Sequence, residues 1–198
     1  IITDPASPTK VGDTVEAQID VTALAGVSVP EGTVQLFDVV NGSSTVLAAG
    51  LQLVNGEATV DLSALDAGDH GLQVSYNPTV GSGWDSAGPS TWQHTVEKSA
   101  STTTLSVSPV ASTTGQAVTL TAAVGSTDGP TAVGKVEFFA DSDLLDSVFV
   151  DASGEAVLTT TSLPVGAQTL TAAFLGDRAL DASESGTVAH TVSESDVE

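Results

Sequence analysis

The chain has 198 residues, 25 acidic against 4 basic side chains, a formal net charge of −21, and neither Cys nor Met. This charge excludes a protein that binds nucleic acid or an anionic membrane through a basic surface, and the lack of Cys excludes disulfides, thiolate nucleophiles and Cys-ligated metal centres. A hydrophobic content of 40% is enough to form folded cores. The sequence contains no run of about 18 apolar residues, the length that would predict a membrane-spanning helix.

The sequence repeats itself once, with a period near 97 residues. The matching segments are Val11–Val15 with Thr114–Val118, Gly32–Phe37 with Gly134–Phe139, Asn55–Ala58 with Ser153–Ala156, and His94–Val96 with His190–Val192. The offset falls from 103 to 96 along the chain, as insertions and deletions in loops would produce. We therefore expect two copies of one domain, residues 1–98 and residues 99–198.

Apolar residues alternate with polar ones in both copies, which is the pattern of half-buried strands. The alternating sets, in chain order, are Val15, Ala17, Ile19 and Val21; Ala58 and Val60; Leu105 and Val107; Val118, Leu120, Ala122 and Val124; Val136 and Phe138; Leu170, Ala172 and Phe174; and Val188, His190 and Val192. Asn41-Gly42 and Asn55-Gly56 favour tight hairpin turns. About seven short strands per copy predict an all-β chain of two Greek-key β-sandwiches.

One corner of the first copy has the layout of an immunoglobulin domain. In Leu65–Leu72, His70 stands where a Tyr often sits, and Leu72 stands where the second Cys would be. Gln168 and Leu170 occupy those places in the second copy. Because the disulfide is absent, we expect apolar packing to hold the two sheets together.

The chain resembles the bacterial immunoglobulin-like repeats of the group 3 type. In the second copy the resemblance is carried by Thr102–Leu105, Gly115–Leu120, Gly134–Phe138, Leu163–Gly166, Gly176-Asp177 and Ala189–Val192. The first copy departs from the pattern, with Asn77-Pro78 in place of Gly176-Asp177 and with Gly81–Trp84 added to the same loop. The resemblance implies two tandem immunoglobulin-like sandwiches from an extracellular bacterial protein, acting as spacers, stalks or adhesion modules. It implies no catalytic residue.

Histidines are the residues that nucleophilic catalysis would need beside a Ser or Thr. The chain has three, His70, His94 and His190, and the last two occupy the same position of the repeat. A position that recurs in both copies favours an architectural role over chemistry. The sequence therefore predicts no enzyme and no catalytic residue.

Acidic residues gather in two places of the second copy, and calcium prefers several oxygen ligands. The candidate ligands are Asp141, Asp143, Asp146, Asp177 and Asp181. Neither group has the spacing of an EF-hand loop, and solvated turns are the competing interpretation. Calcium is the one cofactor for which the sequence offers candidate ligands.

Trp84 is the candidate ligand-binding residue, because it lies in the expanded loop of the first copy and an aromatic face can stack on a sugar ring. Core filling is the competing role for Trp84, Trp92 and Tyr76, since they align with Leu180, Val188 and Phe174. A Lys-to-Asn or Lys-to-Asp isopeptide link would require Lys10 or Lys135 to be buried.

Three functions remain open at this point. The first is a non-catalytic spacer or stalk segment of a larger secreted or cell-wall-attached bacterial protein, whose partners are the neighbouring repeats of the same chain. The second is an adhesin or glycan-binding module that uses loops of the first copy to bind a host or cell-surface glycan or protein. The third is an accessory segment of a secreted hydrolase.

Overall fold

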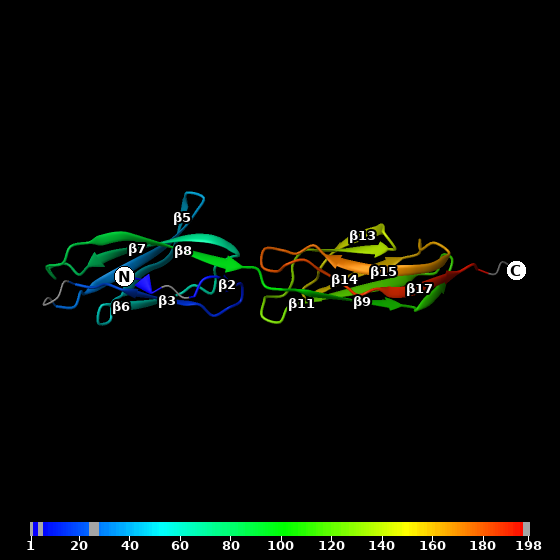
Figure 1. The fold of residues 1–198 in the computed structure, drawn as a ribbon, viewed down its shortest axis with the longest axis horizontal. Helices are drawn as coiled ribbons and strands as arrows, with labels where there is room; N and C mark the ends of the chain where they lie inside the picture. Colours follow the sequence, from blue (N-terminus) through cyan, green and yellow to red (C-terminus); the bar gives the residue numbers. More distant parts are fainter. Residues whose placement is uncertain (1, 4–5, 24–27, 196–198) are drawn as a thin grey trace. The chain divides into compact units, whose positions relative to one another are not determined.

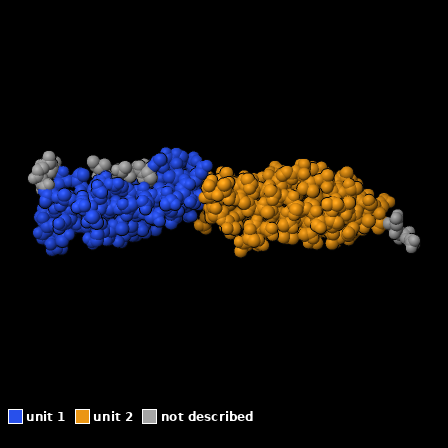
Figure 2. All heavy atoms as spheres, turned by 90° about the horizontal axis from the view of Figure 1, so that it is seen from below, with its two compact units in different colours: residues 1–97 blue, residues 98–198 orange. Residues whose placement is uncertain are grey.

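The computed structural model describes residues 2–3, 6–23 and 28–195. Two compact units, residues 1–97 and residues 98–198, make up the chain (Figures 1 and 2). Among the described residues the regular elements are all β-strands, and none is a helix long and apolar enough to cross a membrane. The all-β class predicted from the alternating apolar residues is confirmed.

The first unit consists of two sheets. The smaller has the strand order β1-β3-β6, and the larger has the order β2-β8-β7-β4-β5. The strands are β1 (Ile2–Thr3), β2 (Thr9–Lys10), β3 (Glu16–Asp20), β4 (Gly32–Val40), β5 (Ser43–Gln52), β6 (Glu57–Asp61), β7 (Gly68–Pro78) and β8 (Ala87–Glu97). This is the crossed order of a Greek-key sandwich, because β3 and β6 pair in one sheet while the intervening hairpin belongs to the other.

The second unit repeats the arrangement. Its smaller sheet has the order β14-β11-β9; its larger sheet has the order β10-β17-β15-β12-β13, and β16 also pairs with β15. The strands are β9 (Thr102–Ser108), β10 (Ala111–Thr113), β11 (Val118–Gly125), β12 (Lys135–Ala140), β13 (Asp143–Phe149), β14 (Glu155–Thr160), β15 (Gly166–Phe174), β16 (Ser183–Glu184) and β17 (Val188–Ser193).

The opening strand of each unit crosses from one sheet to the other. In the second unit β9 runs antiparallel to β11, and β10 then runs parallel to β17 in the opposite sheet. In the first unit β1 pairs antiparallel with β3, and β2 pairs parallel with β8. Each crossing contains a cis peptide bond, at Ser7-Pro8 and at Ser108-Pro109. The first segment of each unit thereby contributes a strand to both of its sheets.

Each unit has its own apolar core between its two sheets, as the alternating pattern predicted. Along β11 the side chains are buried at every second residue, from Val118 to Val124. The same alternation along β3 buries Ala17 and Ile19. The largest buried side chains include Leu36 and Leu72 in the first unit and Phe138, Phe174 and Leu180 in the second. Apolar burial therefore holds the sheets together without a disulfide.

The tight turns form where their residue types predict. Asn41 and Gly42 have φ of 50° and 82° between β4 and β5. Gly56 and its repeat equivalent Gly154 have φ of 85° and 86°, a conformation that favours glycine. A Cβ at Gly154 would lie 2.9 Å from the carbonyl oxygen of Val124. The matching turns therefore fix the same register in both units.

Candidate functional site

The two equivalent histidines each bind a hydroxyl group of the strand that crosses between sheets. His94 Nε2 on β8 lies 2.9 Å from Thr9 Oγ1 on β2. His190 Nε2 on β17 lies 2.9 Å from Ser112 Oγ on β10. Both rings are buried, with 1% and 2% of their surface exposed. The role of these histidines is thus to attach the crossing strand to the last strand of the sandwich.

Thr9 and Ser112 are functional partners that inspection of the sequence did not single out. They are 103 residues apart, which is the offset that relates Val11 to Thr114 in the repeat. The sequence signal that could have identified this pair is a hydroxyl-bearing residue at the same position in both copies. Each hydroxyl and its histidine belong to neighbouring strands of the same sheet.

His70 forms the corner that the sequence predicted. Its Nε2 donates a hydrogen bond of 2.8 Å to the carbonyl oxygen of Asp66, four residues upstream. Its Nδ1 lies 2.9 Å from Asp38 Oδ2, and 8% and 12% of the two side chains are exposed. Both partners are hydrogen-bond acceptors, so the ring links Asp38 on β4 to the loop before β7. His70 replaces the corner Tyr and adds an ion pair to β4.

The aromatic side chains of the first unit pack toward its core. Tyr76 is buried, and its hydroxyl donates a hydrogen bond of 2.7 Å to the carbonyl oxygen of Glu31. Burial, assisted by the charge of Glu31, raises the pKa of Tyr76 above its usual value. Trp84 and Trp92 are half-buried and pack against the same core. A ligand-binding role for Trp84 stays a prediction, and only part of its ring is available for it.

The first acidic group lies on the hairpin of β12 and β13. Asp141 has φ of 54° in the turn, and its Oδ1 accepts a hydrogen bond of 3.0 Å from the amide of Thr169. Asp146 Oδ1 accepts one of 2.7 Å from the amide of Ser147, and Asp143 is exposed. Two of these three carboxylates are therefore already bonded to backbone amides.

The second acidic group lies in the loop between β15 and β16. Asp177 accepts hydrogen bonds of 2.7 Å from three amides, those of Val133, Ala179 and Leu180. The nearby Asp181 contributes its backbone, because its amide donates to the carbonyl oxygen of Ser99 at 2.9 Å. In the described part of the chain no three Asp, Glu or His side chains are grouped so as to hold a metal ion. Calcium binding at either loop stays a prediction.

The two lysines considered for an isopeptide link are both exposed. Lys135 Nζ lies 4.8 Å from the centre of the Phe149 ring, over its face. This exposure is contrary to the buried environment that such a link needs. The Lys135 ammonium instead covers part of an aromatic ring that is 69% exposed.

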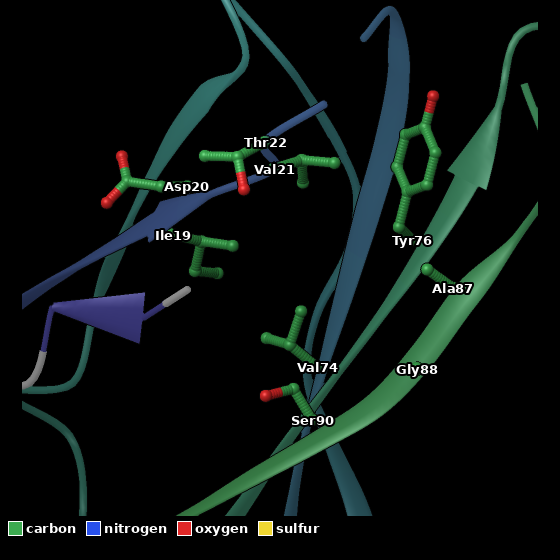
Figure 3. Close-up of a pocket in the computed structure, with 9 residues that line it drawn as sticks. All are labelled: Ile19, Asp20, Val21, Thr22, Val74, Tyr76, Ala87, Gly88 and Ser90. Atoms are coloured by element: carbon green, nitrogen blue, oxygen red, sulfur yellow. The ribbon is translucent and has the colours of Figure 1, made fainter. Parts of the chain in front are cut away.

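A groove of about 170 Å³ opens between the two sheets of the first unit, at the end where β3 and β8 face each other (Figure 3). In Figure 3, Ile19 and Val21 lie on one side of it, and Val74, Tyr76 and Ala87 lie on the other. Asp20, Thr22, Gly88 and Ser90 complete its lining. The groove is mainly apolar, and inspection of the sequence did not predict it.

The bacterial Ig-like domain (group 3) model matches the chain twice, over residues 2–103 and residues 104–193. The chain belongs to this family. The group 3 resemblance and the two tandem immunoglobulin-like domains predicted from the sequence are thereby confirmed.

Solved structures similar to these Ig-like domains have low sequence identity. The fibronectin(III)-like modules of Clostridium thermocellum CbhA are 16% identical, with 100% of this chain and 97% of that chain covered and a TM-score of 0.43. The Yersinia pseudotuberculosis adhesin InvE is 18% identical, with 96% and 58% covered and a TM-score of 0.49. Neither likeness carries a functional argument. No curated protein matches the chain.

Proposed function

We propose that the two Ig-like domains are a non-catalytic spacer or stalk segment of a larger bacterial surface or secreted protein. The observation that carries the proposal is the use of the histidines. His94 and His190 bind the crossing strand at the same place in both domains, and His70 closes a corner. The histidines, whose imidazole groups are the side chains best suited to acid–base chemistry at neutral pH, therefore make structural contacts in each domain.

Charge supports the same role. Twenty-five acidic side chains against four basic ones give every domain a strong negative surface charge. Mutual repulsion of such surfaces opposes aggregation and association between neighbouring copies. A segment that keeps other domains apart benefits from this property, and its neighbours would be further repeats of the same chain outside the cell.

A display experiment tests the spacer function. The chain would be placed between a cell-surface anchor and an epitope tag, and antibody access to the tag would be measured on cells that carry a dense polysaccharide layer. We expect access to increase with two domains and again with four. The matched control replaces the chain with a Gly-Ser linker of 198 residues. Equal access with the flexible linker would contradict the proposal.

The alternative, an adhesin function, would use the loop that contains the partly exposed Trp84. A binding experiment distinguishes the adhesin function from the spacer function. The wild-type chain and a Trp84→Ala variant would be applied to glycan arrays and to host-cell extracellular matrix. The spacer proposal predicts that neither is retained above a Gly-Ser control protein. Retention of the wild type that is lost in the Trp84→Ala variant would establish the adhesin function instead.

A further inference from the structure

A hollow of about 360 Å³ opens on the outer face of the larger sheet of the first domain, and most of its lining consists of Asp69, Gly71, Gln73, Thr91 and Gln93. We call it the Gly71 hollow. Gly71 on β7 is paired with Val39 on β4 and with Gln93 on β8. Its chain neighbours His70 and Leu72 are buried, so the alternation of the strand directs the Gly71 position to the outer face. The Gly71 hollow is therefore on the opposite side of this sheet from the core.

The hollow depends on the missing side chain of Gly71. A Cβ there would lie 2.9 Å from the carbonyl oxygen of Val39 and 3.6 Å from Nε2 of Gln93. Any other residue would therefore occupy the floor of the hollow and push against the backbone of β4. Glycine keeps the space between the groups of β4 and β8 open.

The lining is rich in uncharged groups that form hydrogen bonds. The amides of Gln73 and Gln93 and the hydroxyl of Thr91 come from the neighbouring strands β7 and β8. None of these three side chains forms a hydrogen bond with another residue that the structure describes. Asp69 is the one charged residue of the lining, and its Oδ1 accepts a hydrogen bond of 2.8 Å from the hydroxyl of Thr95. The hollow therefore offers free donors and acceptors beside an oriented carboxylate.

An aromatic ring lies next to this lining on the same face. Phe37 on β4 is paired with Gln73 on one side and with Val46 on the other. Its neighbour Leu36 is fully buried in the core, so alternation directs Phe37 outward, where it is half-buried. Val46 is 51% exposed. Apolar surface thus borders the hydrogen-bonding groups, a combination that is typical of small-molecule sites.

The second domain has the same strands but different side chains at these positions. Thr169 pairs with Ala189 there, as Gly71 pairs with Gln93 in the first domain. The offsets of 98 and 96 that relate these residues are those of the repeat. A Thr side chain therefore replaces the open floor, and a methyl group replaces one amide. The shared strand architecture does not require the features of the Gly71 hollow, which are specific to the first domain.

We propose that the Gly71 hollow binds a neutral sugar ring. The ring lies over Gly71, and its hydroxyl groups bond to the amides of Gln73 and Gln93 and donate to Asp69. An amide both donates and accepts, which matches hydroxyl groups that do the same. The carbon–hydrogen surface of the ring contacts Phe37. Anionic sugars and acidic peptides are disfavoured by Asp69 and by the net charge of −21.

This inference goes beyond the spacer function and does not depend on it. A single shallow site that stays open to water is expected to have a Kd of about 1–10 mM. Binding of this strength does not retain the chain on a washed glycan array. It would let a spacer contact a surrounding polysaccharide repeatedly, through many copies on one surface. The display experiment and a sugar titration therefore test separate properties of the chain.

The side-chain amide signals of Gln73 and Gln93 in nitrogen–proton correlation spectra report directly on the hollow. The full isotope-labelled chain is titrated with three neutral probes, methyl α-mannoside, methyl β-galactoside and methyl β-glucoside. Glucuronate is the anionic probe, and an uncharged Gly-Ser peptide is the peptide probe. Gln93→Ala removes one amide of the hollow, while Gln52→Ala, at an exposed position of β5, is the matched control.

The fold of each variant is checked separately. Both tryptophans, Trp84 and Trp92, lie in the first domain, so tryptophan fluorescence reports the unfolding of that domain alone. Gln93 and Gln52 are both exposed, and we expect both variants to unfold at the wild-type denaturant concentration.

We expect at least one methyl hexoside to shift the two amide signals saturably, with a Kd about tenfold higher for Gln93→Ala and unchanged for Gln52→Ala. Glucuronate should bind about fivefold more weakly than the corresponding neutral sugar. No saturable shift at about 100 mM of each hexoside would overturn the proposal. Equal shifts with the Gly-Ser peptide, or equal affinity of Gln93→Ala, would also overturn it, because the hollow would then not distinguish sugars or would not use its amides.

Discussion

His190 Nε2 and Ser112 Oγ are 2.9 Å apart across the parallel pair of β17 and β10, and His94 and Thr9 make the same contact at the same distance in the first domain. The sequences around these pairs differ, but the buried ring and the hydroxyl partner are kept in both. Each pair adds a side-chain bond to a short edge strand, since β2 has two residues and β10 has three. The contact is therefore expected to limit local unfolding of the crossing strand.

Removal of the hydroxyl at Thr9 tests this contact. The Thr9→Val variant keeps the side-chain shape but leaves His94 Nε2 without this partner, which should cost about 1–2 kcal/mol of first-domain stability. Guanidinium unfolding followed by tryptophan fluorescence measures it. Thr59→Val, at an exposed position of β6, is the matched control and should have an effect below about 0.5 kcal/mol. Indistinguishable midpoints for the two variants would show that the hydrogen bond contributes nothing.

A double-mutant cycle measures the corner ion pair. His70→Ala and Asp38→Ala are made singly and together, and unfolding of the first domain is again followed by tryptophan fluorescence. Because the pair is mostly buried and 2.9 Å long, we expect a coupling free energy of about 1–3 kcal/mol. Purely additive losses would mean that His70 acts only through its bond to Asp66.

Trp92 has a buried indole nitrogen with no hydrogen-bond partner among the described residues. Trp92→Phe removes this unsatisfied donor and keeps most of the apolar surface, so stability should change by less than about 0.5 kcal/mol or increase. Trp92→Ala should cost about 3 kcal/mol, because it opens a cavity. Circular dichroism during denaturation compares the three proteins. A loss with Phe as large as the loss with Ala would contradict the prediction.

Substitution of Asp177 tests whether its carboxylate stabilises the fold or binds calcium. Its oxygens accept three amide hydrogen bonds, so Asp177→Ala should destabilise the second domain by about 2 kcal/mol in EDTA as well as in millimolar calcium. Asp143→Ala, at the exposed start of β13, should change the stability of the second domain by less than about 0.5 kcal/mol. Calorimetry of the unfolding of the second domain is the measurement. Stabilisation of the wild type by calcium and not by magnesium, absent from Asp177→Ala, would instead identify a calcium site.

Acid should weaken the turn at Asp151. A hydrogen bond from the Ser153 hydroxyl, with others from the amides of Glu155 and Ser153, lowers the pKa of Asp151 below its usual 3.8. Because the pKa is lowered in the folded state, the stabilisation is complete above pH 3.8 and is lost as pH falls through the folded-state pKa. The stability difference between wild type and Asp151→Asn should therefore shrink on acidification. A difference independent of pH would refute this.

The sequence by itself determined the class of fold and the repeat. Alternation along Val118–Val124 and along Ala17–Ile19 reports which side chains face the core, because successive residues of a strand point to opposite faces. Asn41-Gly42 identified a turn, since few residue pairs tolerate positive φ. The Leu65–Leu72 layout located the corner at which His70 bonds back to Asp66.

Only the tertiary structure decided what the polar residues contact. His190 and Ser112 are separated by 78 residues, and Asp177 and Val133 by 44, so no local pattern reveals that each pair is bonded. The groove is lined by residues of β3, β7 and β8, which are far apart in the sequence. Alternation fixes the face on which a side chain lies but not its neighbour across the sandwich, because that neighbour is set by register and by the packing of two sheets.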